Sequence, residues 1–234
     1  DNFEHLLEGV DLLADLLAHS SEVKLLITSR ERLNLQGETV FHVGGMAYPD
    51  QGMVEDIAEY SAVQLFLDNV RRLRPELILT NQALADAARI CRQAQGMPLA
   101  IVLAAAWVDT LSLAEISQEL AKSLDFLKVE LRNVPERHRG IRAAFDPSWK
   151  MLPDEEREVF IRLAVFRGGF TREAVEAVAG ASLHILAVLV NKSLLRHDPV
   201  GRYDMHELLR QYAEEKLKAS AEESEAARDR HCAY

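Results

Sequence analysis

The stretch of sequence that decides the fold is 193–205, which reads SLLRHDPVGRYDM. Two short runs in this stretch flank the segment Asp198-Pro199-Val200-Gly201. Proline and glycine favour a tight chain reversal, because proline fixes φ near −65° and glycine accepts a positive φ. The stretch therefore predicts two short strands joined by a turn.

Helical patterns precede this hairpin, and their limits are marked by local signals. Pro153 and the acidic residues after it suit a first helical turn, since proline has no N–H to lose there and carboxylates favour the positive end of the helix dipole. Glycines at 168, 169 and 180 mark helix ends. The predicted helices span 153–166, 171–180 and 182–192. Three helices followed by a two-stranded hairpin are typical of a winged helix.

Upstream of this region the chain is also helical. Apolar residues between 58 and 73 follow the 3.6-residue period, and Pro75 ends that pattern. Thr80 or Asn81 can cap the next helix, and Ser112 with Glu115 has the form of a capping box. We therefore expect a small helical domain there.

The first residues of the chain have a different pattern. The run 22–30, EVKLLITSR, is short, apolar and β-branched, as in a buried strand of a parallel sheet. A helical pattern precedes it, and the run 39–43 follows as a further short strand. These elements predict the last βαβ part of a sheet. The expected fold is mainly α with this α/β remnant, and its four parts are 1–47, 48–130, 131–205 and 206–234, the last a helix leading to a following region.

Five motifs in order carry a resemblance to a known family. They begin with Asp1-Asn2 and continue with Leu26-Ile27-Thr28-Ser29-Arg30, Gly96-Met97-Pro98-Leu99-Ala100, Lys192-Ser193-Leu194 and Met205-His206-Glu207-Leu208-Leu209. Their order is similar to that of STAND-class, NB-ARC-like signalling ATPases, and the resemblance covers nearly the whole chain. It implies the end of a P-loop nucleotide-binding domain, a helical ARC-like domain and a winged helix. It also implies a switch that ADP locks and ATP activates, in which this chain is an internal piece of a larger protein.

The resemblance assigns four site residues. Asp1 stands at the catalytic Walker B position and would hold Mg²⁺, Arg30 would reach the γ-phosphate, Pro98 would contact the adenine, and His206 would touch the β-phosphate of ADP. Each has a simpler interpretation: a helix-capping acid, a surface arginine, a common Gly-x-Pro loop, and a cap or packing histidine. Asn2 follows Asp1 where many relatives have a second acid, and an amide cannot act as a general base.

The sequence also limits what this chain can do alone. It contains no Gly-x-x-x-x-Gly-Lys-[Ser/Thr] phosphate loop. We therefore expect negligible ATP turnover by the chain itself and place ATP or ADP, Mg²⁺ and slow hydrolysis in the intact parent protein. Activation would involve protein partners or self-oligomerisation.

Charge and composition bear on the alternatives. The formal net charge is −10, which opposes broad binding to a phosphate backbone. The expected recognition helix, 182–192, has few side chains able to contact bases, and we do not expect DNA binding by this segment. The basic residues near the start of the third part favour a solvated linker: Arg132, Arg137, His138, Arg139 and Arg142. Two alternatives remain open, a winged-helix transcription regulator that binds DNA and a structural helical adaptor without nucleotide.

The two cysteines and the hydropathy pattern suggest the compartment. Cys91 and Cys232 are far apart and match no metal or redox spacing, so a reduced cytoplasmic protein is expected. The longest apolar run, 98–108, is too short to cross a bilayer. We therefore expect no membrane association.

Overall fold

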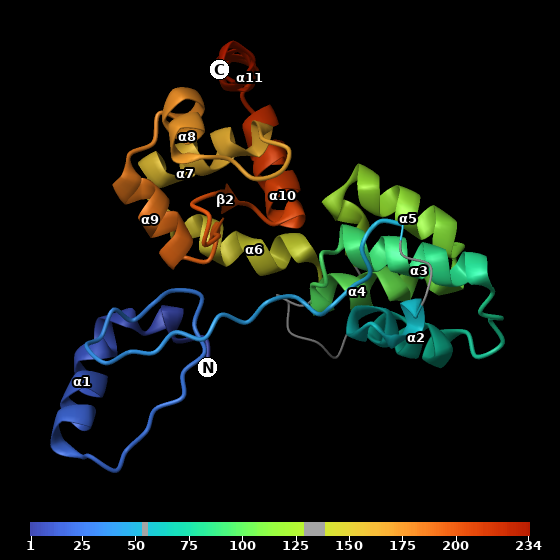
Figure 1. Ribbon diagram of the computed structural model, residues 1–234, viewed down its shortest axis with the longest axis horizontal. Helices are drawn as coiled ribbons and strands as arrows, with labels where there is room; N and C mark the ends of the chain where they lie inside the picture. Colours follow the sequence, from blue (N-terminus) through green and yellow to red (C-terminus); the bar gives the residue numbers. More distant parts are fainter. Residues whose placement is uncertain (53–55, 129–138) are drawn as a thin grey trace.

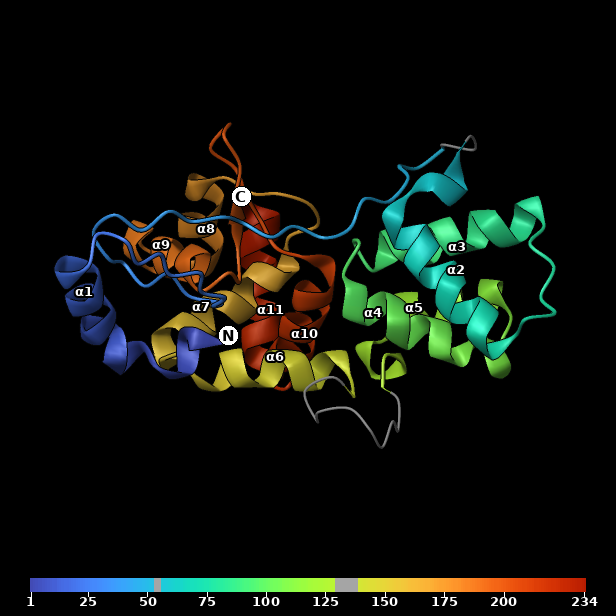
Figure 2. The same ribbon diagram turned by 90° about the horizontal axis from the view of Figure 1, so that it is seen from below.

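The computed structural model describes residues 1–52, 56–128 and 139–234. It is mainly helical, as predicted, and Figure 1 shows three parts along the chain. Helices α2 to α5 form one bundle, and α6 to α11 with a small hairpin form a second body. Figures 1 and 2 both show an extended chain running from α1 past the second body to α2.

The N-terminal part is mostly extended. Its helical elements are η1 (Phe3–His5), η2 (Leu7–Gly9) and α1 (Val10–His19). The prediction of strands at 22–30 and 39–43 is wrong for this structure, which assigns no strand to either run. A strand needs a hydrogen-bonded neighbour, and none of the described residues forms a ladder with these runs, so Leu26, Phe41 and Val43 are exposed at 99%, 88% and 88%. The P-loop sheet remnant is therefore not seen.

The first bundle comprises η3 (Ile57–Glu59), α2 (Ser61–Leu73), α3 (Asn81–Gln93), α4 (Pro98–Ala105), η4 (Ala106–Asp109), α5 (Leu113–Lys122) and η5 (Leu124–Phe126). Helix α3 packs on α5, and α2 packs on α4. The Thr80 hydroxyl accepts the Ala83 N–H at 3.2 Å, and both halves of the Ser112–Glu115 capping box are present. Local capping chemistry thus defines these helices as the sequence predicted.

The second body comprises α6 (Ile141–Lys150), α7 (Asp154–Arg162), η7 (Leu163–Val165), α8 (Arg172–Ala179), α9 (Leu183–Asn191), β1 (Arg196–His197), β2 (Tyr203–Asp204), α10 (Glu207–Lys218) and α11 (Ala221–Ala233). Strands β1 and β2 pair antiparallel, with Arg196 opposite Asp204. The turn between them uses Gly201 at φ 90°. The predicted three helices and hairpin of a winged helix are therefore confirmed.

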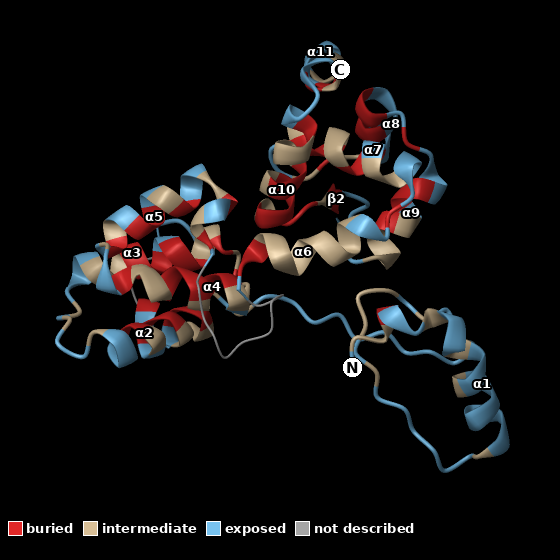
Figure 3. Ribbon diagram, turned by 180° about the vertical axis from the view of Figure 1, so that it is seen from behind, coloured by how far each residue is buried: buried red, intermediate tan, exposed pale blue. Residues whose placement is uncertain are grey.

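Two helices of this body differ from the sequence-based prediction. Helix α6 contains Pro147 inside its span and was not predicted. The end of the chain, predicted as a helix over 206–234 that leads to a following region, is divided at Ser220 into α10 and α11, and α11 packs on α8, α10 and η7. Ser224 and Ala227 on α11 are buried, and Figure 3 shows buried residues lining the faces of α7, α8 and α10 that meet.

In the described part of the chain, no single helix is long and apolar enough to cross a membrane. The bent pair α8 and α9, with a break of 106°, meets the criterion by length and composition only.

Candidate functional site

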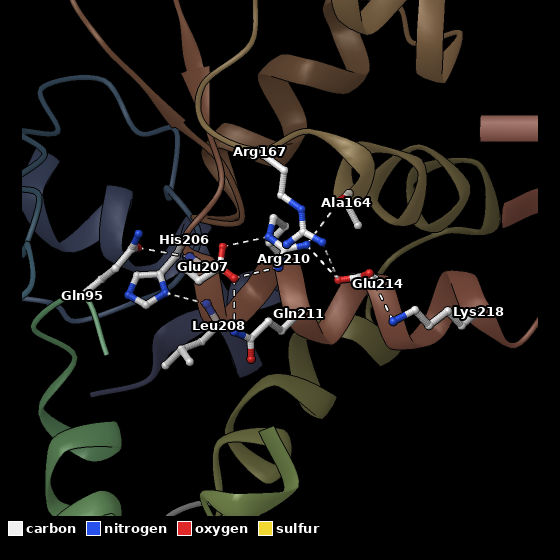
Figure 4. Close-up of polar contacts among 10 residues, drawn as sticks. All are labelled: Gln95, Ala164, Arg167, His206, Glu207, Leu208, Arg210, Gln211, Glu214 and Lys218. Carbon is white, nitrogen blue, oxygen red and sulfur yellow. Dashed lines mark hydrogen bonds and ion pairs between the residues drawn. The ribbon is translucent and has the colours of Figure 1, made fainter. Parts of the chain in front are cut away.

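His206 occupies the N-cap of α10 and is 5% exposed. Its Nδ1 accepts the Leu208 N–H at 3.2 Å, as Figure 4 shows. That bond assigns the proton of the neutral ring to Nε2. Burial lowers the pKa of His206 to about 4, with the charge of Arg196 adding to the effect and that of Glu207 opposing it. At neutral pH the side chain therefore offers one N–H donor and no charge.

The turn between α3 and α4 meets the start of α10. The Gln95 side-chain oxygen accepts the Glu207 N–H at 3.1 Å (Figure 4). This turn is built by two successive residues with positive φ, Gln95 at 46° and Gly96 at 68°, before Pro98 begins α4. Two motifs more than a hundred residues apart, Gly96-Met97-Pro98 and the His206 motif, are therefore brought to one junction between the two bodies.

Close packing fixes this turn from its other side. The Met46 N–H donates to the Gly96 carbonyl at 2.8 Å. A β-carbon built on Gly96 would collide with the Met46 backbone. Only glycine therefore fits this position, both for its φ and for the space around it.

A buried arginine that the sequence analysis missed lies one turn further along α10. The Arg210 guanidinium is 4% exposed and forms ion pairs with Glu207 at 2.7 Å and Glu214 at 2.9 Å (Figure 4). Burial favours the neutral form of Glu207, but the hydrogen bonds from Arg210 and Gln211 bring the pKa of its carboxyl below the ordinary value. In the sequence, Glu207 and Arg210 are spaced i, i+3, and Arg210 and Glu214 are spaced i, i+4. This spacing was the signal from which the ion pairs could have been predicted.

Asp1 and Arg30 do not lie at the junction of the Gly96-Met97-Pro98 and His206 motifs. The Asp1 carboxylate accepts a hydrogen bond from the Thr28 hydroxyl, and the Asn2 N–H donates to the same hydroxyl at 3.1 Å. Arg30 Nη1 donates to the Ala144 carbonyl at 2.9 Å and to the Ser148 hydroxyl at 2.8 Å, both on α6. Arg30 Nε also lies 3.5 Å from the buried Glu4 carboxylate, so the Arg30 side chain joins the N-terminal segment, which it shares with Asp1, to α6. Within the described residues, no hydrogen bond or ion pair joins Asp1 or Arg30 to Pro98 or His206.

Asp1 is the residue that the sequence predicts as a Mg²⁺ ligand. The described residues contain no group of three or more His, Cys, Asp or Glu side chains arranged to hold a metal ion. Magnesium in nucleotide sites is held by one or two carboxylates, with phosphates and waters completing its shell. A single carboxylate at Asp1 fits one such ligand position.

Two cations beside helix α9 and in the hairpin contact other described residues, whereas Arg196 on β1 is exposed. Lys192, just after α9, pairs with Glu156 at 2.9 Å, and Arg202 donates to the Gly169 carbonyl. The Ser193 hydroxyl donates to the Arg30 carbonyl at 2.8 Å, so the N-terminal segment contacts the turn after α9. This region is therefore engaged by neighbouring parts of the protein.

The predicted basic stretch falls partly outside the described residues. Arg132, Arg137 and His138 lie outside the described residues. Arg142 is paired with Asp125 at 2.9 Å and with Glu215 at 2.6 Å. At this described position, the basic residue serves as an intramolecular partner for acidic side chains.

Comparison with known proteins identifies one domain. Residues 152–218 match the family model of the winged helix-turn-helix domain. The chain contains a winged helix-turn-helix domain. The match begins at the residue before Pro153 and ends at the last residue of α10, so it includes the His206 cap and the Arg210 ion pairs.

Relatives extend the similarity along the chain. The chain is 37% identical to a protein of Mycobacterium tuberculosis (strain ATCC 25618 / H37Rv) whose name describes an HTH-type transcriptional regulator. The alignment covers 98% of this chain and 26% of that protein. A protein of Mycobacterium bovis with the same type of name matches equally. An uncharacterised protein of the same M. tuberculosis strain is 33% identical over 95% of the chain and 57% of its own length. The chain thus spans about a quarter of the first two relatives, and homology to regulators of this type is shown, whereas the nucleotide assignment stays a prediction.

Proposed function

We propose that this chain is the regulatory segment of a transcription regulator, in which the winged helix docks on other parts of the same protein and does not itself bind bases. The observation that carries the proposal is the engagement of the winged helix at two places. Gln95 from the first bundle binds the start of α10, and the N-terminal segment binds α6 and the turn after α9. The names of the relatives support the link to transcription.

The surface chemistry of α9 supports docking over base contact. Base recognition in the major groove uses side chains such as Arg, Lys, Asn and Gln at the start of the recognition helix. Here that start carries Ser182, Leu183 and His184, and the helix is otherwise mostly apolar. The one lysine beside it is already paired with Glu156. A chain of net charge −10 adds a repulsive field for nucleic acid.

DNA binding by the chain is tested by fluorescence anisotropy with labelled duplexes over a salt titration. Duplexes of random sequence and duplexes selected by the full-length regulator are both used. We expect no binding whose affinity falls with salt. Salt-dependent binding that is lost when His184 and Lys192 are replaced would overturn the docking proposal and favour base recognition by α9.

The docking role is tested in the full-length regulator with Gln95→Ala. This variant removes the acceptor for the Glu207 N–H and is expected to change regulated transcription in a reporter assay while leaving the DNA affinity of the regulator unchanged. Gln64→Ala is the matched control, since the Gln64 amide donates only to the exposed Glu59 carbonyl within α2 and its entry. Equal reporter output from Gln95→Ala and Gln64→Ala would contradict the role of the junction.

A second candidate function, control by adenine nucleotide, is favoured by one specific observation. The Gly96-Met97-Pro98 turn lies against the His206 motif through Gln95, so two of the four proposed nucleotide contacts share one place. There the neutral His206 could donate from Nε2 to a phosphate oxygen, and Pro98 could present an apolar surface to the base. Arg30 would contact the γ-phosphate only after leaving Ala144 and Ser148 on α6. Asp1 would supply one ligand to Mg²⁺.

The test is the nucleotide released when full-length protein, purified without added nucleotide, is denatured. Stoichiometric ADP is expected, and His206→Ala is expected to release it faster, with the exposed His184→Ala as the matched control. An empty protein would overturn nucleotide control and leave the adaptor interpretation. The ATP and Mg²⁺ would act in the intact parent, whose partners or self-association follow activation.

A further inference from the structure

A cavity of about 300 Å³ lies where η7, α10 and α11 meet, away from the junction at His206. Ala164 and Leu217 contribute apolar surface to it, and Arg167, Glu214, Arg228 and His231 contribute polar groups. Figure 4 shows the Arg167 side chain reaching toward Glu214. Apolar walls with a few convergent polar groups are the usual form of a small-molecule site.

The single carboxylate in this cavity is already neutralised. Glu214 forms ion pairs with Arg210 at 2.9 Å, Lys218 at 3.1 Å and Arg167 at 3.4 Å. Burial acts to raise the pKa of Glu214, but the hydrogen bonds from Arg210 and Lys218 outweigh it and lower the pKa below the ordinary value. The carboxylate is therefore ionised and held by three cations, so the local charge is positive although the chain as a whole is acidic.

Donor groups remain unused on the opposite wall. Within the described part of the chain, Arg228 makes no hydrogen bond and no ion pair. The His231 ring stands edge-on to Phe166 at 5.0 Å, and its ring nitrogens have no hydrogen-bond partner among the described residues. Both side chains come from α11 and line the cavity. The site therefore has a guanidinium and an imidazole free to bind a ligand.

We propose that this cavity binds a small organic acid, with its carboxylate at Arg228 and His231 and its apolar body against Ala164 and Leu217. A guanidinium matches a carboxylate through two parallel N–H···O bonds, which a surface lysine cannot reproduce. The apolar surface selects an anion with a hydrocarbon part over an inorganic anion. Such a ligand contacts α10 through Leu217 and thereby reaches the helix that meets Gln95, so it is a candidate effector of the regulator.

Binding is measured by isothermal titration calorimetry of the purified chain with benzoate, hexanoate, benzamide and inorganic phosphate. Saturable one-to-one binding is expected for benzoate or hexanoate, and weaker binding for benzamide, which has the apolar body of benzoate without its charge. Arg228→Gln should weaken binding about tenfold or more, because a hydrogen bond to a charged group is lost. Arg71→Gln is the matched control, an exposed arginine on α2 paired only with Asp68.

The outcomes decide the proposal in either direction. Equal affinity of Arg228→Gln and Arg71→Gln for the acids, or no saturable binding of either acid, would overturn it. Phosphate binding as tight as benzoate would overturn the assignment of an organic acid. Arg228 is exposed and makes no contact that folding depends on, so its replacement leaves a folded protein in which the comparison is valid. Amide NMR shifts that are largest in α11, η7 and the end of α10 would support the location.

Discussion

Replacing His206 by Asn should make the stability of the protein less sensitive to acid. The buried ring has a pKa of about 4, against an ordinary value of 6.5. Between those values the unfolded chain binds a proton that the folded protein excludes, so stability falls as pH falls from about 6.5 and is unaffected by this group above that range. At 1.36 kcal/mol per pH unit, the loss is about 2 kcal/mol at pH about 5 and about 3 kcal/mol at pH about 4.

Asn is the informative replacement because its side chain can still cap α10. Both proteins contain the same carboxylates, whose titration therefore cancels when the two are compared. The assay is urea unfolding followed by circular dichroism at neutral pH and at pH about 5. The wild-type protein should lose about 2 kcal/mol more than His206→Asn between the two conditions. His184→Asn, at an exposed position on α9, should behave as the wild type.

Parallel stability curves for the wild type and His206→Asn would refute this reasoning. That result would mean that His206 is as easily protonated in the folded protein as in the unfolded chain. The folded protein would then carry a protonated His206 below about pH 6.5, which contradicts the lowering of its pKa by burial.

Three further predictions concern packing around the two bodies. Gly96→Ala should lower the free energy of unfolding by about 2 kcal/mol or more, because a β-carbon there meets the Met46 backbone. Gly201→Ala has open space around it and should lower the free energy of unfolding by only about 1 kcal/mol, because of its positive φ. Urea titration compares the two variants. Arg210→Met should lose about 2 to 3 kcal/mol in the same assay, since Glu207 and Glu214 lose hydrogen bonds from a buried partner while Glu214 keeps Lys218 and Arg167, and a loss near zero would contradict the role of the ion pairs. Arg30→Gln should speed proteolysis within the residues before α2. Amide exchange in the winged-helix core should stay as in the wild type. Unchanged proteolysis would show that the contact with α6 does not hold this segment.

The helices of the winged helix could be predicted from the sequence because their limits are set by neighbouring residues. Ser182 accepts the Ile185 N–H at 3.3 Å, as an N-cap should, and Gly180 ends α8 in the left-handed conformation. The Thr171 hydroxyl likewise accepts the Ala174 N–H at 3.3 Å. Each of these choices depends on contacts within a few residues along the chain. Such choices are visible in a single sequence.

Strands and buried charges could not be predicted in the same way. The run 22–30 has strand composition, but composition does not supply the neighbouring strand that its backbone requires. The Phe3 N–H donates to the Thr28 carbonyl at 3.0 Å, and no ladder of the described residues extends this contact. Helix α6 was not predicted, and the structure accommodates Pro147 within it. The position of Arg30 was not predictable either, since its partners Ala144 and Ser148 lie more than a hundred residues away.

Helix α10 connects the features that the sequence presented separately. Its first residues meet the α3–α4 turn through Gln95, and Glu207 there shares Arg210 with Glu214 one turn later. Glu214 in turn lines the cavity beneath α11. A ligand that draws Arg167 or Arg228 into the cavity changes the charge facing Glu214, and Arg210 must then divide its hydrogen bonds differently between the two carboxylates. Because Arg210 is buried, that redistribution is costly unless the start of α10 moves. The same ion pairs that stabilise the helix therefore give a physical route from the cavity to the junction between the two bodies. Arg210→Met should abolish any effect of a cavity ligand on amide exchange at Gln95 and Gly96.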